Sequence, residues 1–295
     1  MQVQEIERVK HISREGFRSH YLIPGKPVII EDIAKQWPAF EKWTWEYFKE
    51  IAGSVEVPVY NNSRAGAKVP VNGWDDKMKF SDYIDMISKG DCEWRIFLFN
   101  LFRHAPFLKK DFEYPSLLIK GFVKAFPMLF VGGAGSIAHM HYDIDLSHIF
   151  HTQFIGRKRV LLLDQAQNQL IYKMPGTVES AASFVHWEQG LDYERFPALE
   201  YAEGYTAILE HGDTLYMPGG YWHHMQYMES GFAMSLRAMP TGISGKLDGL
   251  YHLAVMRHFN NMLIRLSPEW WYQYKREKAK KAAELAMLNR FHPEI

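Results

Sequence analysis

Short apolar runs separated by turn residues dominate the middle of this chain, from about residue 94 to residue 240. The runs are rich in β-branched and aromatic residues, and Gly, Asp and Pro interrupt them, as is typical of β-strands. No helical pattern separates one run from the next, which favours an antiparallel sandwich or barrel over a doubly wound parallel sheet. The predicted strands cover residues 94–99, 128–131, 149–155, 159–163, 205–209, 214–217, 223–228 and 232–237.

The two ends of the chain follow other patterns. Toward the N-terminus, residues 26–30 predict a strand, and two helices are expected, the first capped by Thr44 and the second by Ser81. From Ser244 onward apolar residues recur at helical spacing, and a charged, Ala-rich segment follows at 275–288. We therefore expect a mainly β domain over residues 1–240, with an N-terminal α/β elaboration at 1–93, a barrel core at about 94–240, and a C-terminal helical segment at 241–295.

Charge and composition narrow the classes of function. The 34 basic residues balance 34 acidic ones, which argues against a dedicated nucleic-acid-binding protein. The single cysteine, Cys92, excludes an intrachain disulfide and a thiolate metal site built by this chain alone. Residues 1–7 are polar and acidic, unlike a signal peptide, and no apolar run approaches the ~20 residues of a membrane span. We expect a cytoplasmic protein that does not enter a membrane.

Two segments carry the residues of a candidate metal site. In segment 139–143, His141 and Asp143 are two residues apart, so in an extended chain both side chains point to the same face. In segment 211–224, a Gly-Asp turn, a strand and a Pro-Gly-Gly turn lead to a second strand that opens with His223. Such a hairpin can bring His223 beside the first pair. Two histidines and one carboxylate on one side of a metal form the facial triad of non-haem iron(II) oxygenases.

Each half of this constellation has an ordinary alternative explanation. A chain with 14 histidines contains a His-x-Asp triplet easily by chance, and a lone histidine on a strand is more often a surface residue. The two segments in this order, with Trp222 and two histidines after the Pro-Gly-Gly turn, are far more specific. We predict that His141, Asp143 and His223 are the metal ligands and the catalytic centre.

A cation at the start of a predicted inner strand is the third element. Lys158 opens the strand at 159–163, and a cation inside a barrel is costly unless an anion pairs with it. The distal carboxylate of 2-oxoglutarate, whose other end chelates iron, is such an anion. Arg157 and Arg159 are better explained as parts of a basic surface turn. Arg237 on the last strand is a competing cation, since other 2-oxoglutarate oxygenases use an arginine from that region.

Several of these segments resemble the cupin-like branch of the JmjC family, which includes asparaginyl hydroxylases similar to factor inhibiting hypoxia-inducible factor. The likeness covers most of residues 20–240 and is carried by segments 26–30, 37–40, 141–143, 156–159 and 212–224. It implies a double-stranded β-helix, the jelly-roll or cupin barrel. It also implies that His141, Asp143 and His223 hold Fe(II) and that Lys158 holds 2-oxoglutarate.

This chain departs from the family's pattern at two places. The family often has a threonine three residues before the first metal histidine, where this chain has Ala138. Many relatives have an asparagine shortly after the aspartate, where this chain has Ser147 and His148. We expect His148 or Thr152 to supply the missing contacts to 2-oxoglutarate.

The resemblance implies a dioxygenase that hydroxylates a C–H bond of a peptide side chain or of a small molecule. Three alternatives remain open. The first is a non-redox cupin that uses Mn, Zn or Ni for isomerase-type chemistry, which would not need Lys158. The others are a catalytically silent binding protein and an RNA-modifying hydroxylase of the same fold, which the neutral overall charge makes less favourable.

The C-terminal segment carries more apolar residues than a lone terminal helix can hide, among them Leu247, Tyr251, Phe259 and Leu266. These residues either fold back on their own barrel or meet the same helices of a second subunit. Similar hydroxylases dimerise through C-terminal helices, so we expect a two-fold homodimer.

Overall fold

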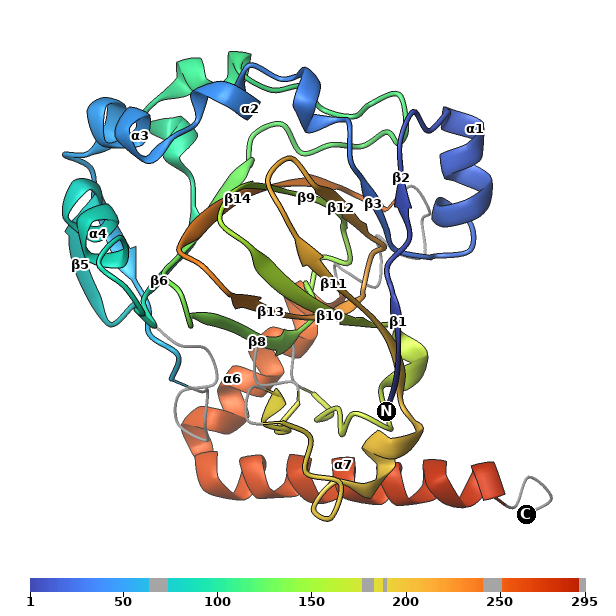
Figure 1. Cartoon of the computed structure of the whole chain (residues 1–295). Coiled ribbons are helices and arrows are strands. Elements are labelled where there is room, and N and C mark those ends of the chain that lie inside the picture. The colour runs from blue at the N-terminus through green and yellow to red at the C-terminus, as the bar shows by residue number, and fades with distance from the viewer. Residues whose placement is uncertain (64–73, 177–182, 188–189, 241–250, 292–295) are drawn as a thin grey trace.

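Two β-sheets face each other and form a barrel-like sandwich in the computed structural model (Figure 1). The structure describes residues 1–63, 74–176, 183–187, 190–240 and 251–291. One sheet has the strand order β1-β11-β10-β13-β8 and the other has the order β2-β3-β12-β9-β14-β7-β6, while β4 and β5 form a separate pair. The strands are β1 Gln2–Glu5, β2 Arg8–Val9, β3 Val28–Ile30, β4 Glu56–Val59, β5 Asp76–Lys79, β6 Arg95–Phe99, β7 Met128–Gly132, β8 Ile137–His141, β9 His148–Ile155, β10 Lys158–Leu163, β11 Glu203–Leu209, β12 Thr214–Met217, β13 Trp222–Tyr227 and β14 Gly231–Ala238.

Helices lie at both ends of the chain. Those before the barrel are α1 Arg14–Phe17, α2 Ala39–Lys42, α3 Trp45–Ala52 and α4 Phe80–Ile87, and those after it are α6 Arg257–Leu266 and α7 Pro268–Phe291. Shorter helical turns lie at Arg18–Leu22, Ala34–Gln36, Leu101–Arg103, Pro106–Lys110, Gln165–Gln167, Pro197–Tyr201 and His252–Met256.

The central strands are antiparallel, as the strand pattern predicted. In the seven-stranded sheet β9 lies between β12 and β14, and in the five-stranded sheet β10 lies between β11 and β13, all with antiparallel pairing. The N-terminal strands differ, because β1 pairs with β11 and β2 pairs with β3 in parallel. The fold is mainly β with added helices, in keeping with a jelly-roll barrel.

Alternation along each strand sorts the apolar side chains into separate cores. The core between the sheets takes Ile149 of β9 and Leu215 of β12 from one sheet, and Val160 of β10 and Met225 of β13 from the other. Phe150, one position further along β9, packs in a different core on the outer face of its sheet. On β9, side chains two positions apart therefore share a face, and those one position apart lie on opposite faces.

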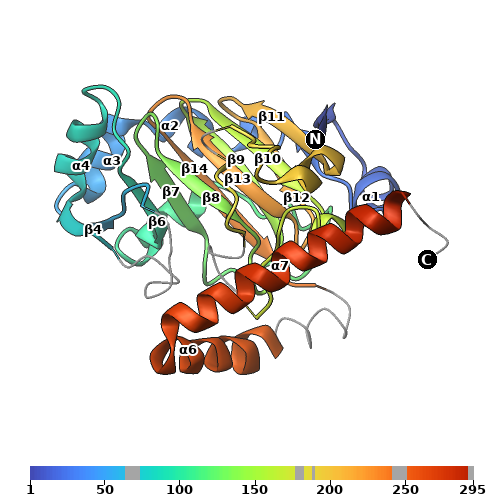
Figure 2. The same cartoon turned by 90° about the horizontal axis from the view of Figure 1, so that it is seen from below.

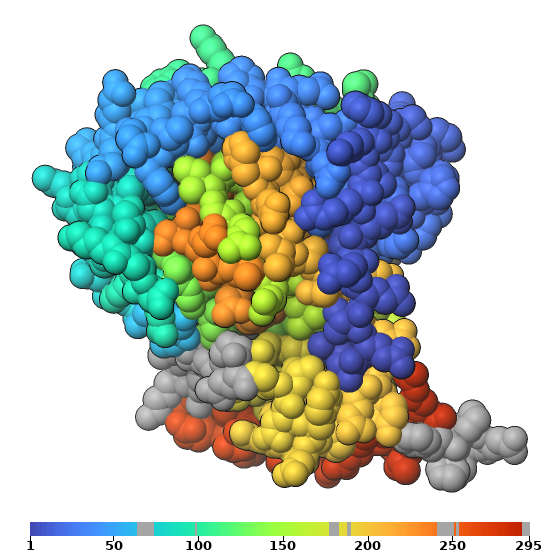
Figure 3. Space-filling view, in the orientation of Figure 1, coloured from blue at the N-terminus to red at the C-terminus, as the bar shows by residue number. Residues whose placement is uncertain are grey.

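The N-terminal elaboration covers the outer face of the seven-stranded sheet, and Figure 3 shows it framing one face of the molecule in blue and teal. The ring of Phe48 on α3 meets Phe232 of β14 edge-on at 4.8 Å between centroids, and Trp43 packs on Phe154 of β9 at 4.9 Å. The indole of Trp43 also donates a hydrogen bond to the buried carboxylate of Asp111. These large buried rings stabilise the seven-stranded sheet by packing on its outer face.

The outer face of the five-stranded sheet is covered by the connection between β10 and β11 and by α7 (Figure 2). Met140 of β8 and Trp222 of β13 are buried there in one apolar cluster with Ala279 and Ala283 of α7. Each of these two strand residues directly precedes a histidine that was predicted to bind metal. The packing of α7 therefore supports the two strands that carry the candidate ligands.

The local predictions for the two N-terminal helices had different outcomes. Thr44 caps α3, because its hydroxyl accepts a hydrogen bond from the backbone amide of Tyr47. The prediction that Ser81 caps the next helix is wrong. That helix, α4, already begins at Phe80 with Lys79 in the capping position, and the hydroxyl of Ser81 donates to the neighbouring Asp82 instead.

The C-terminal residues are helical from residue 251 onward, as predicted, whereas the expected helical start at 244–250 lies outside the described residues. Because α7 packs on its own chain, part of the apolar C-terminal segment does fold back on the barrel. Within the described ranges, no helix combines the length and the apolar character that crossing a membrane requires.

The docking of α7 can be tested with one charge at two positions of the same helix. Ala283 is fully buried (0% exposed), whereas Leu285 is 58% exposed. Ala283→Glu would place an unpaired charge in the apolar cluster, so we expect the free energy of unfolding to fall by ~3–5 kcal/mol. Leu285→Glu should change it by no more than ~0.5 kcal/mol. Chemical denaturation measures both, and equal stabilities would contradict this docking.

Candidate metal centre

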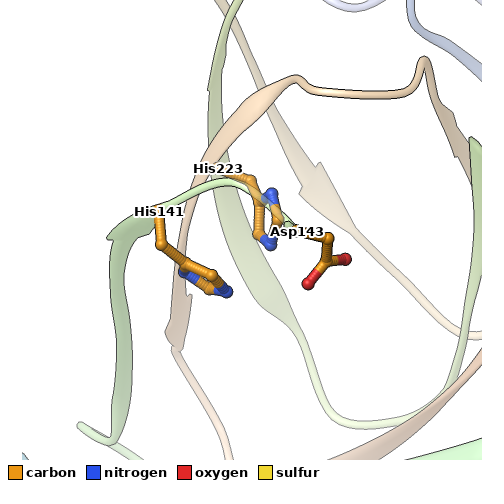
Figure 4. Close-up of side chains that lie close together, drawn as sticks. All are labelled: His141, Asp143 and His223. Carbon is orange, nitrogen blue, oxygen red and sulfur yellow. The ribbon is translucent and has the colours of Figure 1, made fainter. Parts of the chain in front are cut away.

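Three side chains from two neighbouring strands and the loop after one of them converge on one point (Figure 4). His141 is the last residue of β8, Asp143 lies in the loop that follows, and His223 is the second residue of β13. The strands pair with His141 opposite His223, and the imidazole centroids are 4.2 Å apart. Possible ligand atoms of the three residues all lie within 4.8 Å of one another. The fold thus brings together the three residues that the sequence singled out.

The backbone orients both imidazoles. Nδ1 of His141 lies 2.6 Å from the carbonyl oxygen of His139, and Nδ1 of His223 lies 3.1 Å from that of Tyr221. A carbonyl oxygen only accepts, so each Nδ1 carries the hydrogen and each Nε2 keeps its lone pair. A hydrogen bond of this kind fixes the tautomer of a metal-binding histidine and the direction of its ring.

The charges of the cluster favour the forms that bind metals. Burial, with a smaller contribution from the charge of His141, lowers the pKa of His223 to about 4, so its imidazole is neutral at physiological pH. Burial alone would raise the pKa of Asp143, but the neighbouring groups, among which Arg237 has the largest effect, outweigh burial and the pKa lies below its ordinary value. The cluster offers two imidazoles and one carboxylate, a donor set that suits iron(II) and similar divalent metals.

Arg237 of β14 is engaged by two carboxylates. Its Nη2 lies 3.1 Å from Oδ2 of Asp143 and its Nη1 lies 3.1 Å from Oδ2 of Asp145. Asp145 is held in turn by the backbone amide and the hydroxyl of Ser147, which both donate to its Oδ1. Burial alone would lower the pKa of Arg237, but the two carboxylates raise it above its ordinary value. The role of Arg237 in binding 2-oxoglutarate stays a prediction, and this geometry favours a role in orienting Asp143.

Lys158 is the first residue of β10 and is 1% exposed. It shares the barrel interior with Val160, and its Nζ lies 4.2 Å from the centroid of the Tyr227 ring and 3.1 Å from Nε2 of His151. None of the described carboxylates forms an ion pair with it, and burial lowers the pKa of Lys158 to about 7. A buried cation in such surroundings is unfavourable by itself, so an anionic ligand would stabilise it.

His148 and Thr152 are placed on the other face of β9. Both share the parity of Phe150, which packs outside the barrel. Nδ1 of His148 lies 3.0 Å from the hydroxyl of Tyr216, and the hydroxyl of Thr152 lies 3.0 Å from that of Thr214. The fold does not bring either residue to the three candidate ligands. Their contacts to 2-oxoglutarate stay predictions that this placement does not favour.

Two residues of the interior were missed by the sequence analysis. Asp145 continues the two-residue spacing of His141 and Asp143, and that spacing was the available signal. His151 shares the parity of the interior residue Ile149, so strand alternation could have placed it beside Lys158. Neither residue stands in a motif, and their contacts depend on how distant strands pair.

The barrel and the candidate metal site are those of a cupin-type protein. Residues 14–262 match the family model described as a cupin-like domain. This match spans most of the chain, so the chain belongs to the cupin-like domain family. The resemblance to the cupin-like branch of the JmjC family is thereby confirmed.

Curated relatives are similar to a comparable share of the chain. The chain is 28% identical over 229 residues to "Lysine-specific demethylase 8" of Xenopus tropicalis, which covers 76% of this chain and 50% of that protein. It is 28% identical over 260 residues to "JmjC domain-containing protein D" of Dictyostelium discoideum, covering 77% and 55%. It is 22% identical over 265 residues to "tRNA wybutosine-synthesizing protein 5" of Homo sapiens, covering 82% and 81%. The chain spans about half the length of the first two relatives.

Two adjacent histidines on β13 allow the candidate ligand to be tested against a matched control. His223→Ala should weaken binding of manganese(II) at least ~100-fold, because even residues that only orient a ligand contribute ~10–100-fold. His224 lies one position further along the strand, opposite Leu161 of β10, and points to the other face. His224→Ala should therefore retain the metal. Calorimetric titration of both variants checks this, and a larger loss in His224→Ala would show that the ligand was misassigned.

Proposed function

We propose that this protein is an iron(II)- and 2-oxoglutarate-dependent dioxygenase that hydroxylates a C–H bond of a peptide side chain or a small molecule. The observation that carries the proposal is a cluster of two histidines and one carboxylate in the same barrel as a buried lysine with no carboxylate partner among the described residues. When bound, iron(II) with 2-oxoglutarate and O₂ supplies the oxidation, in which one oxygen atom enters succinate as CO₂ leaves and the other enters the substrate.

The residues of this chain have separate tasks in that proposal. His141, Asp143 and His223 would hold the metal from one side, which leaves its other positions open. Arg237 binds one oxygen of Asp143 and leaves the other for the metal. Lys158 would bind the distal carboxylate of 2-oxoglutarate, since its ammonium group is buried and faces the same interior. Because water does not reach that ammonium group, its ion pair with a ligand would be strong.

The same buried lysine argues against a non-redox cupin enzyme. Such an enzyme needs the metal ligands but does not need a buried cation to bind a co-substrate carboxylate. Lys158 would then destabilise the fold without contributing to the binding of any ligand, since desolvating an ammonium group is costly. The complete ligand set likewise argues against a catalytically silent scaffold.

The substrate class is proposed from the names of relatives and from charge. One relative is named as a lysine-specific demethylase and another as a tRNA wybutosine-synthesizing protein, so both peptide and RNA substrates are candidates. The chain has no excess of basic residues, with 34 basic and 34 acidic side chains. RNA binding depends on neutralising phosphates, so a peptide side chain or a small molecule is the better proposal.

A homodimer through the C-terminal helices is also proposed. An apolar stripe, defined by exposed residues that recur every three or four positions, follows α6, the turn before it and the start of α7, and α6 lies at the edge of the molecule beyond α7 (Figure 2). Its residues are each between 41% and 73% exposed: Tyr251, Val255, Phe259, Met262, Leu266, Trp270 and Tyr274. A stripe of this kind on a single copy is large enough to be an interaction site. A second copy would cover it by two-fold symmetry with the same residues.

The activity is tested by succinate formation from 2-oxoglutarate in the presence of iron(II) and O₂. Lys158→Ala should raise the KM for 2-oxoglutarate about 10- to 100-fold, because a buried carboxylate loses a charge-assisted partner. Arg159→Ala is the matched control. Arg159 is the next residue of β10, is exposed on the outer face and should leave the KM unchanged.

Two outcomes would contradict the proposal. Absence of succinate from the iron-loaded wild-type protein would remove the proposed activity. If Arg237→Ala raised the KM for 2-oxoglutarate while Lys158→Ala did not, Arg237 would be the co-substrate residue and the assignment of Lys158 would be wrong.

The dimer is tested on the full chain by light scattering at micromolar concentration. Phe259→Asp places a charge in the middle of the apolar stripe and should convert a dimer to a monomer. Leu285→Asp adds the same charge to α7 at an exposed position outside the stripe and should leave the dimer intact. A monomeric wild-type protein would exclude the homodimer.

A further inference from the structure

Three buried polar side chains form a chain of contacts across the barrel interior. Nδ1 of His151 lies 2.8 Å from the hydroxyl of Ser235, and its Nε2 lies 3.1 Å from Nζ of Lys158. The three residues are between 1% and 3% exposed. Ser235 and His151 lie opposite each other on the paired strands β14 and β9, whereas Lys158 belongs to the other sheet. The contact between His151 and Lys158 therefore joins the two sheets of the barrel.

The direction of these hydrogen bonds follows from their chemistry. A protonated lysine only donates, so Nε2 of His151 accepts from Lys158. The hydrogen of the neutral imidazole is then on Nδ1, which donates to the oxygen of Ser235. Burial, aided by the positive charge of Lys158 and by His223, lowers the pKa of His151 well below its ordinary value. His151 therefore stays neutral and remains an acceptor for the ammonium group.

The other neighbours of Lys158 offer no negative charge. The ring of Tyr227 on β13 faces Nζ, and burial raises the pKa of its hydroxyl far above the physiological range. Arg95 on β6, whose charge acts on Tyr227, is itself positive. Phe130 on β7 faces His151 at 5.9 Å between centroids. His223, on the same strand as Tyr227, is neutral. Within the described part of the chain, His151 is thus the acceptor that the ammonium group has.

We propose that His151 is a positioning residue for the co-substrate: held by Ser235, it accepts a hydrogen bond from Lys158, keeps its ammonium group charged, and makes 2-oxoglutarate binding take up a proton above neutral pH. The inference rests on the proposed function, because it takes Lys158 as the anchor of the distal carboxylate. It goes beyond that function in two respects: it assigns His151 as the partner of Lys158, and it predicts that the affinity for the co-substrate depends on pH.

The sign of the pH dependence follows from the two states of Lys158. In the free protein burial lowers its pKa to about 7. A bound carboxylate stabilises the ammonium form and raises that pKa. Affinity for 2-oxoglutarate is therefore complete below about pH 7 and falls as the pH rises above it, by about tenfold per pH unit when one proton is linked. Loss of His151 removes an acceptor, which moves the start of this fall to lower pH.

The test is calorimetric titration of 2-oxoglutarate into the full-length, manganese(II)-loaded protein without O₂, from pH 6 to pH 9. Two buffers of different ionisation enthalpy give the number of protons taken up. We expect a Kd that is constant below about pH 7 and rises above it, with close to one proton taken up at the alkaline end. In His151→Phe, binding at pH 8 should be about tenfold weaker than in the wild type, while binding at pH 6 changes much less.

Two variants and one control separate positioning from a merely structural role. His151→Gln keeps an acceptor near Nε2 and should restore the wild-type pH profile. Ser235→Ala removes the partner of Nδ1 and should shift the profile in the same direction as His151→Phe, by less. Thr214→Val removes a buried hydroxyl pair from the outer face of the same sheet and should leave the profile unchanged.

The outcomes distinguish this inference from the function on which it rests. A wild-type Kd that does not change between pH 6 and pH 9 overturns the inference, as does a profile that is identical in the wild type, His151→Phe and Ser235→Ala. In both cases 2-oxoglutarate still binds and the proposed function stands. If the wild-type protein does not bind 2-oxoglutarate at all, the proposed function fails and the inference fails with it.

Discussion

The pairing of β8 with β13 is the constraint on which the candidate metal centre depends. It sets His141 opposite His223 and turns both imidazoles to the barrel interior. Met140 and Trp222, one position before each histidine, face the apolar cluster that α7 covers. A slip of one residue would exchange the two faces and bury the imidazoles among apolar side chains. Packing behind the sheet therefore specifies the register, and the register assembles the site.

Two cations of the barrel, Arg237 and Lys158, have different partners. Arg237 is neutralised by Asp143 and Asp145, which places a fixed charge pair next to the candidate ligands and restricts the direction of the Asp143 carboxylate. Lys158 has only the neutral His151 and an aromatic ring beside it. Desolvation is costly for both groups, but only Lys158 would gain an ion pair when an anion arrives. This difference favours Lys158 over Arg237 as the partner of the co-substrate carboxylate in the proposed function.

Membership of the cupin-like domain family defines the barrel and the type of site, and it leaves the substrate to the surfaces around them. Relatives named as a lysine-specific demethylase and as a tRNA wybutosine-synthesizing protein are similar to 76% and 82% of this chain. The stretch that matches the family model, residues 14–262, contains the strands that carry the three candidate ligands and Lys158. In this protein the N-terminal helices cover the outer face of one sheet. The helix α7 and the β10–β11 connection cover the outer face of the other.

The sequence by itself indicated most strands of the barrel and the candidate ligand set. Strand alternation, turn residues and the spacing of His141 and Asp143 are local properties, and they survive in any fold that buries one face of each strand. The short strands β1, β2 and β5 carry few apolar residues and no such pattern; β1 and β2 lie at sheet edges, and β5 belongs to a separate pair. Only the tertiary structure decided that Arg237 pairs with Asp143 and that His151 meets Lys158. Those contacts join different strands and sheets, so they depend on register and barrel closure, which no local pattern encodes.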